Sequence, residues 1–323
     1  MSKTVVVALG GNALLKKGEK GTVYEQFENT RKSCVQLVKI VQAGHKLVLT
    51  HGNGPQVGAI MLQNEASAHV SPPMPLGICV TESQGFIGYM VQQCMSNAME
   101  KMNMRVPVVT LITQTLVDDN DPSFANPTKP IGQFYTEEKA KELMKIREDL
   151  GVKDFVMKED SGRGWRRVVA SPDPKSIIEH KIIRKLADDG IIPVCVGGGG
   201  SAVARTSIED RKGPLDGREV VIDKDLASSV LAREINADEF VILTDVEKVA
   251  INFGKPNQQF LDKMTVAEAR KYLAEGQFGK GSMAPKVEAA VRFVESGKPR
   301  AIIASLEKAM QALDGKAGTV IVP

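Results

Sequence analysis

Short runs rich in valine, isoleucine and leucine alternate along the chain with longer segments whose apolar residues recur at helical spacing. The short runs predict strands at Thr4–Leu9, Leu47–Thr50, Val106–Ile112, Ile191–Val196, Glu239–Thr244, Ala301–Ala304 and Thr319–Val322. The longer segments predict helices at Tyr24–Ala43, from "HGNGPQVG" to about His69, and at Glu82–Lys101, Leu226–Glu234 and Pro285–Ser296. Apolar strands separated by helices are typical of an α/β fold with a mainly parallel sheet covered on both faces.

One long stretch, at about residues 117–173, breaks this alternation. It is rich in Pro, Asp and Lys, holds the only tryptophan, Trp165, and shows one clear helix at Glu137–Leu150. A piece of this length between two core strands predicts an inserted subdomain rather than a loop. Inserts that fold over strand ends often act as lids, and an insertion used only as an oligomer contact is the alternative.

Composition narrows the function classes. The 323 residues are 42% hydrophobic and 25% charged, which is typical of a globular protein large enough for one large α/β domain or two smaller ones. A net charge of +3 is too small to indicate nucleic acid or an anionic membrane as a partner. No apolar run approaches the roughly 18–20 residues that a membrane helix needs.

The cysteines and the N-terminus bear on the compartment. Cys34, Cys79, Cys94 and Cys195 lie far apart without a C-x-x-C pair, a spacing that favours buried thiols over disulfides or zinc ligands. The first strand begins within four residues of the N-terminus, which leaves no room for a signal peptide. We therefore expect a cytoplasmic location.

Three glycine-rich segments each follow a predicted strand. They are Gly10-Gly11-Asn12, His51-Gly52-Asn53-Gly54 and Gly197–Gly200. In an open parallel sheet ligands bind outside the carboxyl ends of the strands, where backbone N–H groups can hold an anion. Any one of these segments could simply permit a tight turn, but three together favour an anion site.

Several familiar motifs are missing from the chain. It contains no Walker A sequence, no protein-kinase H-R-D with D-F-G, no G-x-S-x-G and no H-E-x-x-H. The first βα unit also lacks G-x-G-x-x-G. These absences weaken the hydrolase and dehydrogenase hypotheses.

Three lysines stand in loops or at helix starts, where a phosphate would need them. Lys129 lies between two prolines in the insert, Lys224 lies between Asp223 and Asp225 at a helix start, and Lys286 begins another helix. Asp225 could be only a helix N-cap, or it could hold the lysines in place. Most other lysines fall on solvated helix faces.

Candidate general bases are scarce. His51 beside the second glycine segment is better placed to orient that loop than to accept a proton, and the other histidines look structural or solvent-facing. Phosphoryl transfer to an acceptor that is already ionised needs charge neutralisation and alignment rather than a strong base. The residues therefore favour a carboxylate-like or phosphate-like acceptor.

Nine segments in order resemble the amino acid kinase superfamily, and within it the carbamate kinase branch. They are "ALGGNALL", "THGNGPQVG", "ESQGFIGYM", "NPTKPIGQFY", "EDSGRGWRRVV", "GGGG", "VIDKDLAS", "LTDVEKVAINFGKP" and "GSMAPKV", and they span the whole chain. The resemblance implies a single domain over residues 1–323, a three-layer αβα sandwich with a protruding subdomain over the site, and a homodimer. It implies reversible, Mg²⁺-dependent phosphoryl transfer between ATP and carbamate, usually in arginine catabolism, by way of the arginine deiminase pathway.

The resemblance also implies roles for individual residues. Around carbamate and the moving phosphoryl group it places Gly10, Gly11, Asn12, Gly52, Asn53 and Gly54. It gives Lys129 and Lys224 the neutralisation of phosphate charge, Asp225 the ordering of the lysines, and Lys286 the nucleotide phosphates. Around the nucleotide it places Gly198, Gly199, Thr244, Asp245, Val246 and Met283. The ligands of Mg²⁺ remain unassigned.

One departure from the wider superfamily is informative. Relatives such as acetylglutamate kinase carry a lysine two residues before the first glycine pair, where this chain has Ala8. Carbamate kinases share that absence, and the resemblance assigns the missing charge to Lys129. A kinase for another small carboxylate or phosphate remains an alternative, as does a non-catalytic nucleotide sensor, although the sensor would be expected to lose these lysines or Asp225.

Overall fold

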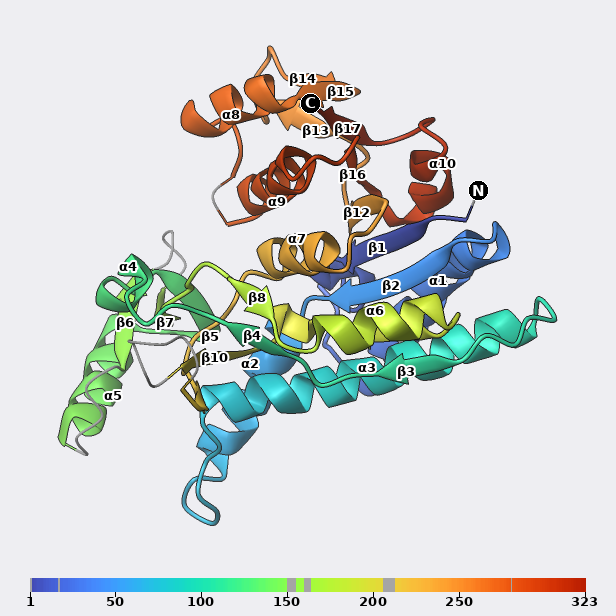
Figure 1. Ribbon diagram of the computed structural model, residues 1–323. Helices are drawn as coiled ribbons and strands as arrows, with labels where there is room; N and C mark the ends of the chain where they lie inside the picture. Colours follow the sequence, from blue (N-terminus) through green and yellow to red (C-terminus); the bar gives the residue numbers. More distant parts are fainter. Residues whose placement is uncertain (1, 17, 150–154, 160–163, 206–212, 280) are drawn as a thin grey trace.

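A central eight-stranded sheet organises the protein (Figure 1). The structure is a computed structural model that describes residues 2–16, 18–149, 155–159, 164–205, 213–279 and 281–323. The strand order is β15 (Lys263–Thr265), β17 (Thr319–Val322), β16 (Ala301–Ser305), β12 (Glu239–Thr244), β1 (Thr4–Leu9), β2 (Lys46–His51), β9 (Ile192–Cys195) and β3 (Val108–Thr110).

The pairing within this sheet is parallel except between β16 and β17, which confirms the predicted mainly parallel sheet. Leu9 at the end of β1 is in register with His51 of β2 and with Leu243 of β12. Leu243 is in turn in register with Ala304 of β16. The chain therefore leaves β2, β1, β12 and β16 at one edge of the sheet, in that spatial order.

Helices cover both faces of the sheet, as expected for a three-layer αβα sandwich. Successive residues of β1 point to opposite faces, so that Val6 and Ala8 join one core and Val5 and Val7 join the other. The first core is covered by α6 (His180–Asp188), α7 (Lys224–Glu234) and α9 (Met283–Glu295), and the second by α1 (Val23–Gln42), α3 (Leu76–Glu100) and α10 (Ala309–Leu313). Each fully buried valine or leucine contributes about 1.5–3 kcal/mol to folding.

Helix ends show where local sequence decides the boundary and where it does not. Thr22 and Glu25 form a capping box at the start of α1, and Gly44 with φ +84° follows its end, close to the predicted limits. Helix α3, in contrast, begins six residues before its predicted start. The Glu219 carboxylate accepts hydrogen bonds from the backbone of Leu76 and Gly77, so a distant residue caps this helix.

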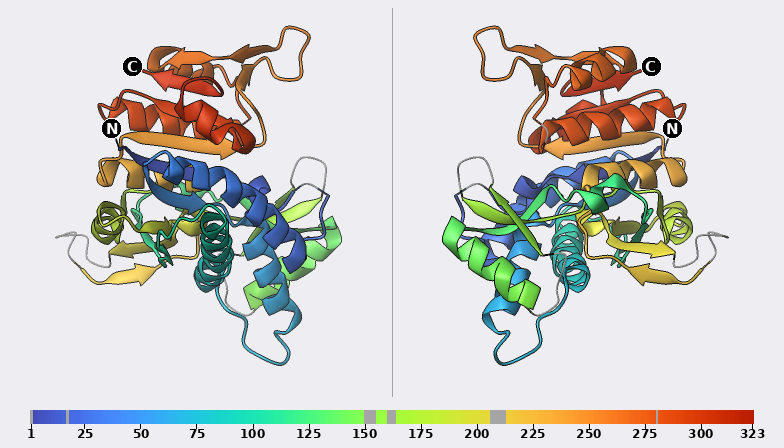
Figure 2. Two further views of the ribbon diagram at one scale, coloured as in Figure 1. Left: turned by 90° about the vertical axis from the view of Figure 1, so that its right-hand side faces the viewer. Right: turned by 90° about the vertical axis from the view of Figure 1, so that its left-hand side faces the viewer.

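The insert has a small sheet of its own, which the sequence patterns did not predict. β5 (Lys129–Tyr135), β7 (Trp165–Val169) and β6 (Val156–Glu159) pair antiparallel, beside α4 (Pro122–Ala125) and the predicted helix, α5 (Glu137–Asp149). Figures 1 and 2 show these elements projecting to one side of the central sheet. A separate small core, which includes Ile131 of β5 and Val57 of α2 (Gly54–Ala66), joins the insert to the main body.

The remaining elements are short. A four-stranded sheet contains β11 (Leu215–Gly217), β10 (Ser201–Arg205), β4 (Gln114–Leu116) and β8 (Ser176–Ile177), and a hairpin contains β13 (Val249–Ile251) and β14 (Gln259–Leu261). Helix α8 (Val266–Ala274) packs on α9, and 3₁₀ turns occupy η1 (Gly11–Ala13), η2 (Gly197–Gly199) and η3 (Leu306–Lys308). All four cysteines are buried free thiols, as predicted. Among the described residues, no helix combines the length and apolar character needed to cross a membrane.

Candidate active site

Three charged side chains meet at the start of α7. The Lys224 ammonium lies 2.5 Å from Asp225 Oδ1, and the Lys286 ammonium lies 2.9 Å from Asp225 Oδ2. The Asp225 side chain is only 4% exposed, and the two lysine side chains are 13% and 14% exposed. One buried carboxylate thus holds two ammonium groups beside each other, and this trio carries one net positive charge.

Burial and charge act against each other in this trio. Burial opposes ionisation of the Asp225 carboxyl, but the two neighbouring ammonium groups outweigh it and lower the pKa of Asp225. Burial lowers the pKa of Lys224; the Asp225 carboxylate opposes that shift and the Lys286 ammonium adds to it. Each charge therefore depends on the others, and the trio is best suited to accept a further anion.

Asp223, not Asp225, is the N-cap of α7. Its Oδ1 accepts hydrogen bonds from the backbone N–H groups of Asp225 and Leu226, at 3.0 and 3.3 Å. The alternative in which Asp225 serves only as a cap is therefore wrong. Because Asp223 takes the capping position, the Asp225 carboxylate is left to the two lysines.

Lys129 reaches this region from the insert. It is the first residue of β5, and its ammonium lies 3.4 Å from Asp223 Oδ2, the oxygen that does not cap α7. The structure thus brings together Lys129, Lys224, Lys286 and Asp225, which were singled out from widely separated parts of the sequence. With Asp223 included, the five groups still carry one net positive charge.

The second glycine segment makes room for Lys224. A Cβ atom at Gly52 would lie 3.3 Å from Lys224 Cδ and 3.6 Å from the backbone nitrogen of Gly11. Ser228 on α7 links the same region to β2, because its hydroxyl donates to the Lys224 carbonyl and lies 2.6 Å from the Thr50 hydroxyl. The glycine segment and the lysine are therefore packed as one unit.

The first glycine segment lies next to them, at the end of β1. The Gly10 N–H donates to the Leu243 carbonyl at 2.9 Å, and a Cβ atom at Gly10 would lie only 3.1 Å from that oxygen. Gly11 begins η1, and a Cβ atom there would meet nothing within 4 Å. Gly11 therefore borders open space, while the side chain of Asn12 lies outside the described part of the structure.

Asn53 and Gly54 begin α2, where Asn53 is buried and its side-chain amide donates to the Ser83 hydroxyl at 2.8 Å. The third glycine segment packs tightly against it: a Cβ atom at Gly198 would lie 2.1 Å from Asn53 Nδ2, and one at Gly199 would lie 2.6 Å from the Ile222 carbonyl oxygen. Both glycines have positive φ, +63° and +93°. Close packing thus explains these two glycines, and their contact with a nucleotide stays a prediction.

A cavity of 690 Å³ opens beside the trio, along the edge of the sheet. Of the residues predicted to bind ligand, it is lined by Gly10, Gly11, Thr244, Asp245 and Lys286. Val246 follows Asp245 in the chain, and Met283, the first residue of α9, packs partly buried against the core; neither lines the cavity. A lining that holds both lysines and carboxylates suits a ligand with an anionic part and a polar, uncharged part.

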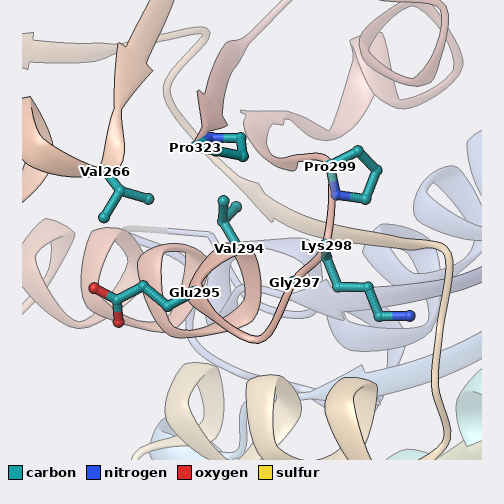
Figure 3. A pocket seen from close by; sticks show the side chains of 7 residues that line it. All are labelled: Val266, Val294, Glu295, Gly297, Lys298, Pro299 and Pro323. Atoms are coloured by element: carbon teal, nitrogen blue, oxygen red, sulfur yellow. The ribbon is translucent and has the colours of Figure 1, made fainter.

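A second cavity, of 490 Å³, lies near the C-terminus and contains none of these residues. Figure 3 shows its lining side chains, among them Val294 and Glu295 at the end of α9 and Pro323. Glu295 is paired with Arg270, and the Lys298 ammonium bonds the Asn236 side chain. The 690 Å³ cavity, and not this one, is therefore the candidate ligand site.

Comparison with known proteins identifies the family. The model of the amino acid kinase family matches residues 3–305. The chain belongs to the amino acid kinase family. It is 52% identical to a carbamate kinase of Pyrococcus furiosus and 50% identical to one of Pyrococcus horikoshii, with all of both chains covered in each case. A solved structure, carbamate kinase from Giardia lamblia bound to AMP-PNP, has a TM-score of 0.91 and 48% identity over 99% of this chain and 98% of that one.

Membership of this family makes the protein a kinase with the fold described above. Sequence patterns missed three charged residues that line the 690 Å³ cavity of this kinase: Lys16, Lys32 and Glu307. Glu307 could have been found, because it follows a predicted strand at the same sheet edge as the glycine segments. Lys16 and Lys32 lacked such a signal, since one lies in an irregular loop and the other on a helix with many charged residues.

His51 of this amino acid kinase is a neutral, buried positioning group. Its side chain is 2% exposed, and its Nδ1 lies 2.9 Å from the Gly52 carbonyl oxygen, to which it can donate as the neutral ring. Burial lowers the pKa of His51 to about 4, and the nearby Lys224 ammonium adds to this effect. The ring therefore holds the glycine segment, in agreement with the expectation that it orients the loop.

The depressed pKa of His51 predicts a pH-dependent stability. Below pH 6.5 the unfolded chain binds a proton at His51 that the folded chain excludes until about pH 4. The contribution is thus complete above pH 6.5 and is lost as the pH falls, by roughly 2 kcal/mol at pH 5. Urea unfolding at pH 7.5 and 5.0 should show a smaller loss for His51→Gln than for the wild type. His69→Gln, at an exposed position, should behave like the wild type, and equal losses in all three proteins would contradict the prediction.

Proposed function

We propose that this kinase transfers a phosphoryl group reversibly between ATP and carbamate: ATP + carbamate ⇌ ADP + carbamoyl phosphate. The observation that carries the proposal is the buried Lys224–Asp225–Lys286 trio at the sheet edge where the glycine segments end. Full-length similarity at about half of all positions to proteins named carbamate kinase supports the choice of acceptor. AMP-PNP in the Giardia relative supports ATP as the nucleotide.

Each of the charged residues has a proposed part in the transfer. Lys129 and Lys224 neutralise the moving phosphoryl group, Lys286 binds the nucleotide phosphates, and Asp225 keeps the lysines in position. Because carbamate is already an anion, no general base is needed to activate it. Carbamate and the phosphoryl group lie in a cradle formed by Gly10, Gly11, Asn12, Gly52, Asn53 and Gly54.

The nucleotide occupies the 690 Å³ cavity in this proposal, where Thr244 and Asp245 lie. Val246, Met283, Gly198 and Gly199 complete its surroundings. The described residues contain no group of three or more His, Cys, Asp or Glu side chains that could hold a metal ion. We therefore propose that Mg²⁺ enters as the Mg–nucleotide substrate, bound mainly to phosphate oxygens and water.

Lys129 takes the place of the lysine that other superfamily members carry at the end of the first strand. Ala8, at that position, is fully buried among apolar residues, so a cation is not expected there. The insert at about 117–173 carries Lys129 to within 3.4 Å of Asp223, at the site. In this proposal the insert acts as a lid over the site. This makes the insert part of the catalytic machinery.

The proposal extends to the setting of the reaction. The enzyme works as a homodimer in the cytoplasm, in the direction of ATP synthesis from carbamoyl phosphate during arginine catabolism. Neither nucleic acid nor a membrane takes part, in keeping with a net charge of only +3.

A coupled assay tests the proposed reaction. The purified protein with carbamoyl phosphate and Mg–ADP should form ATP, measured through hexokinase and glucose-6-phosphate dehydrogenase. Carbamoyl phosphate without the protein corrects for spontaneous decomposition. ATP-dependent turnover of another carboxylate, such as acetylglutamate, without turnover of carbamoyl phosphate would refute the assignment.

A further inference from the structure

The far end of the 690 Å³ cavity contains a carboxylate that the proposed reaction does not use. Glu307 lines the cavity as part of η3, the turn that follows β16, and its side chain is exposed. Among the described residues, no hydrogen bond or ion pair engages its carboxylate. A carboxylate that borders the cavity in this way can accept hydrogen bonds from a bound ligand.

The order of the strands places Glu307 relative to the phosphoryl site. Gly52 follows β2, and Lys224 beside it begins α7. Gly10 follows β1, Asp245 follows β12, and Glu307 follows β16. Neighbouring strands are about 4.8 Å apart, so the end of β16 lies roughly 10 Å along the sheet edge from the end of β1. If the terminal phosphate of a nucleotide lies at the glycine segments, its ribose lies about this distance away, near the end of β16.

Both cations and carboxylates line the cavity. Lys16, Lys32 and Lys286 line it together with Gly10 and Gly11, and the carboxylates Asp245 and Glu307 follow β12 and β16. Phosphates are favoured beside lysines and disfavoured beside carboxylates. An ionised carboxylate can only accept hydrogen bonds, and the two neighbouring hydroxyls of a ribose can only reach it as donors.

We propose that Glu307 binds the ribose hydroxyls of the nucleotide and gives the enzyme its preference for ribonucleotides. Asp245, one strand away, accepts a hydrogen bond from the Thr244 hydroxyl at 3.0 Å, whereas no hydrogen bond or ion pair in the described residues engages the Glu307 carboxylate. This inference rests on the proposed function, because it takes the cavity as the site of ATP and ADP. Glu307 acts in binding and specificity and does not touch the reacting atoms.

Binding of two nucleotides to two proteins tests the proposal. Wild type and Glu307→Gln, both full length, are titrated calorimetrically with Mg–ADP and with Mg–2′,3′-dideoxy-ADP. We expect the wild type to prefer ADP by about tenfold, the range of a hydrogen bond to a charged group. Glu307→Gln should lose most of that preference by binding ADP more weakly, while its affinity for the dideoxy nucleotide stays within about twofold of the wild type's.

A matched control and turnover complete the experiment. Glu100→Gln removes an exposed carboxylate at the end of α3 and should leave both affinities unchanged. In the coupled assay, Glu307→Gln should raise KM for ADP with kcat within about twofold at saturation. Equal loss of affinity for both nucleotides, no loss for either, or a raised Mg²⁺ requirement in place of lost ADP preference would overturn the proposal.

The titration separates this proposal from the proposed reaction. If the wild type binds ADP but fails to use carbamoyl phosphate, the acceptor assignment fails and the role of Glu307 can still be read from binding. If the wild type makes ATP and Glu307→Gln keeps the full preference for ADP, the reaction stands and the role of Glu307 is refuted. A wild type that binds no ADP would refute both.

Discussion

Replacing Asp225 with asparagine is expected to reduce turnover by about a thousandfold and to lower the free energy of unfolding by about 3 kcal/mol. The change removes the carboxylate that lies within 3 Å of both the Lys224 and Lys286 ammonium groups. Removing one partner of a buried ion pair typically costs 3–5 kcal/mol, because a buried charge is left without compensation. Here two ammonium groups would face each other, and Lys224, whose pKa burial already lowers, would lose its proton most readily.

Steady-state kinetics and urea unfolding of the same variant measure both effects. Asp314→Asn is the matched control, since Asp314 and Lys316 form a surface pair at 3.7 Å with both side chains largely exposed. Such surface pairs contribute about 0–1 kcal/mol, so the control should retain its activity and nearly all of its stability. Near-normal turnover in Asp225→Asn would show that the trio is not part of the catalytic site.

Lys129→Ala should lose about 100-fold to 1,000-fold in kcat while the protein still folds. In the proposed mechanism this lysine neutralises charge on the moving phosphoryl group, and one such donor is worth about that factor. Its only ion pair in the described residues, with Asp223, is long at 3.4 Å, and the Lys129 side chain is about one third exposed. The free energy of unfolding should therefore change by less than about 1 kcal/mol.

The control for this variant is Lys139→Ala, on α5 of the same insert. Lys139 is half exposed and pairs with Glu142 on the helix surface, so its loss should change neither the rate nor the stability. Steady-state kinetics and urea unfolding of both variants measure the change in kcat and in the free energy of unfolding. A near-normal rate for Lys129→Ala would show that the insert lysine is dispensable and that the missing strand-end cation is supplied elsewhere.

Three strands of the central sheet could be predicted from the sequence residue by residue, whereas β3 is shorter than its predicted range, Val106–Ile112, and β15 was not predicted. Thr4–Leu9, Glu239–Thr244 and Thr319–Val322 were predicted with the bounds that the structure shows. These strands belong to the central sheet, where nearly every side chain is apolar because both faces are covered by helices. The strands of the insert, β5, β6 and β7, were missed because they mix charged and apolar residues and bury only some of them.

The lysines and glycines of the candidate site could also be identified from the sequence. Ligand-binding loops follow strands in such sheets, and helix N-termini attract anions. The roles within the site did not follow. Two aspartates flank Lys224, and sequence alone could not tell which one caps the helix and which one binds the lysines. Likewise, Gly198 and Gly199 read as an anion loop, whereas close contacts with Asn53 and Ile222 also require glycine there.

The alternation of strands and helices, and the glycines and lysines that follow strands or begin helices, could thus be read from the sequence, because hydrophobic periodicity and the residues next to an element are local properties. Only the tertiary structure decided that Asp225 joins Lys224 to Lys286, that the insert brings Lys129 beside Asp223, and that Glu307 borders the same cavity. These contacts join residues that are as many as 94 positions apart in the case of Lys129 and Asp223. Such contacts depend on how helices and strands pack, which no local pattern records.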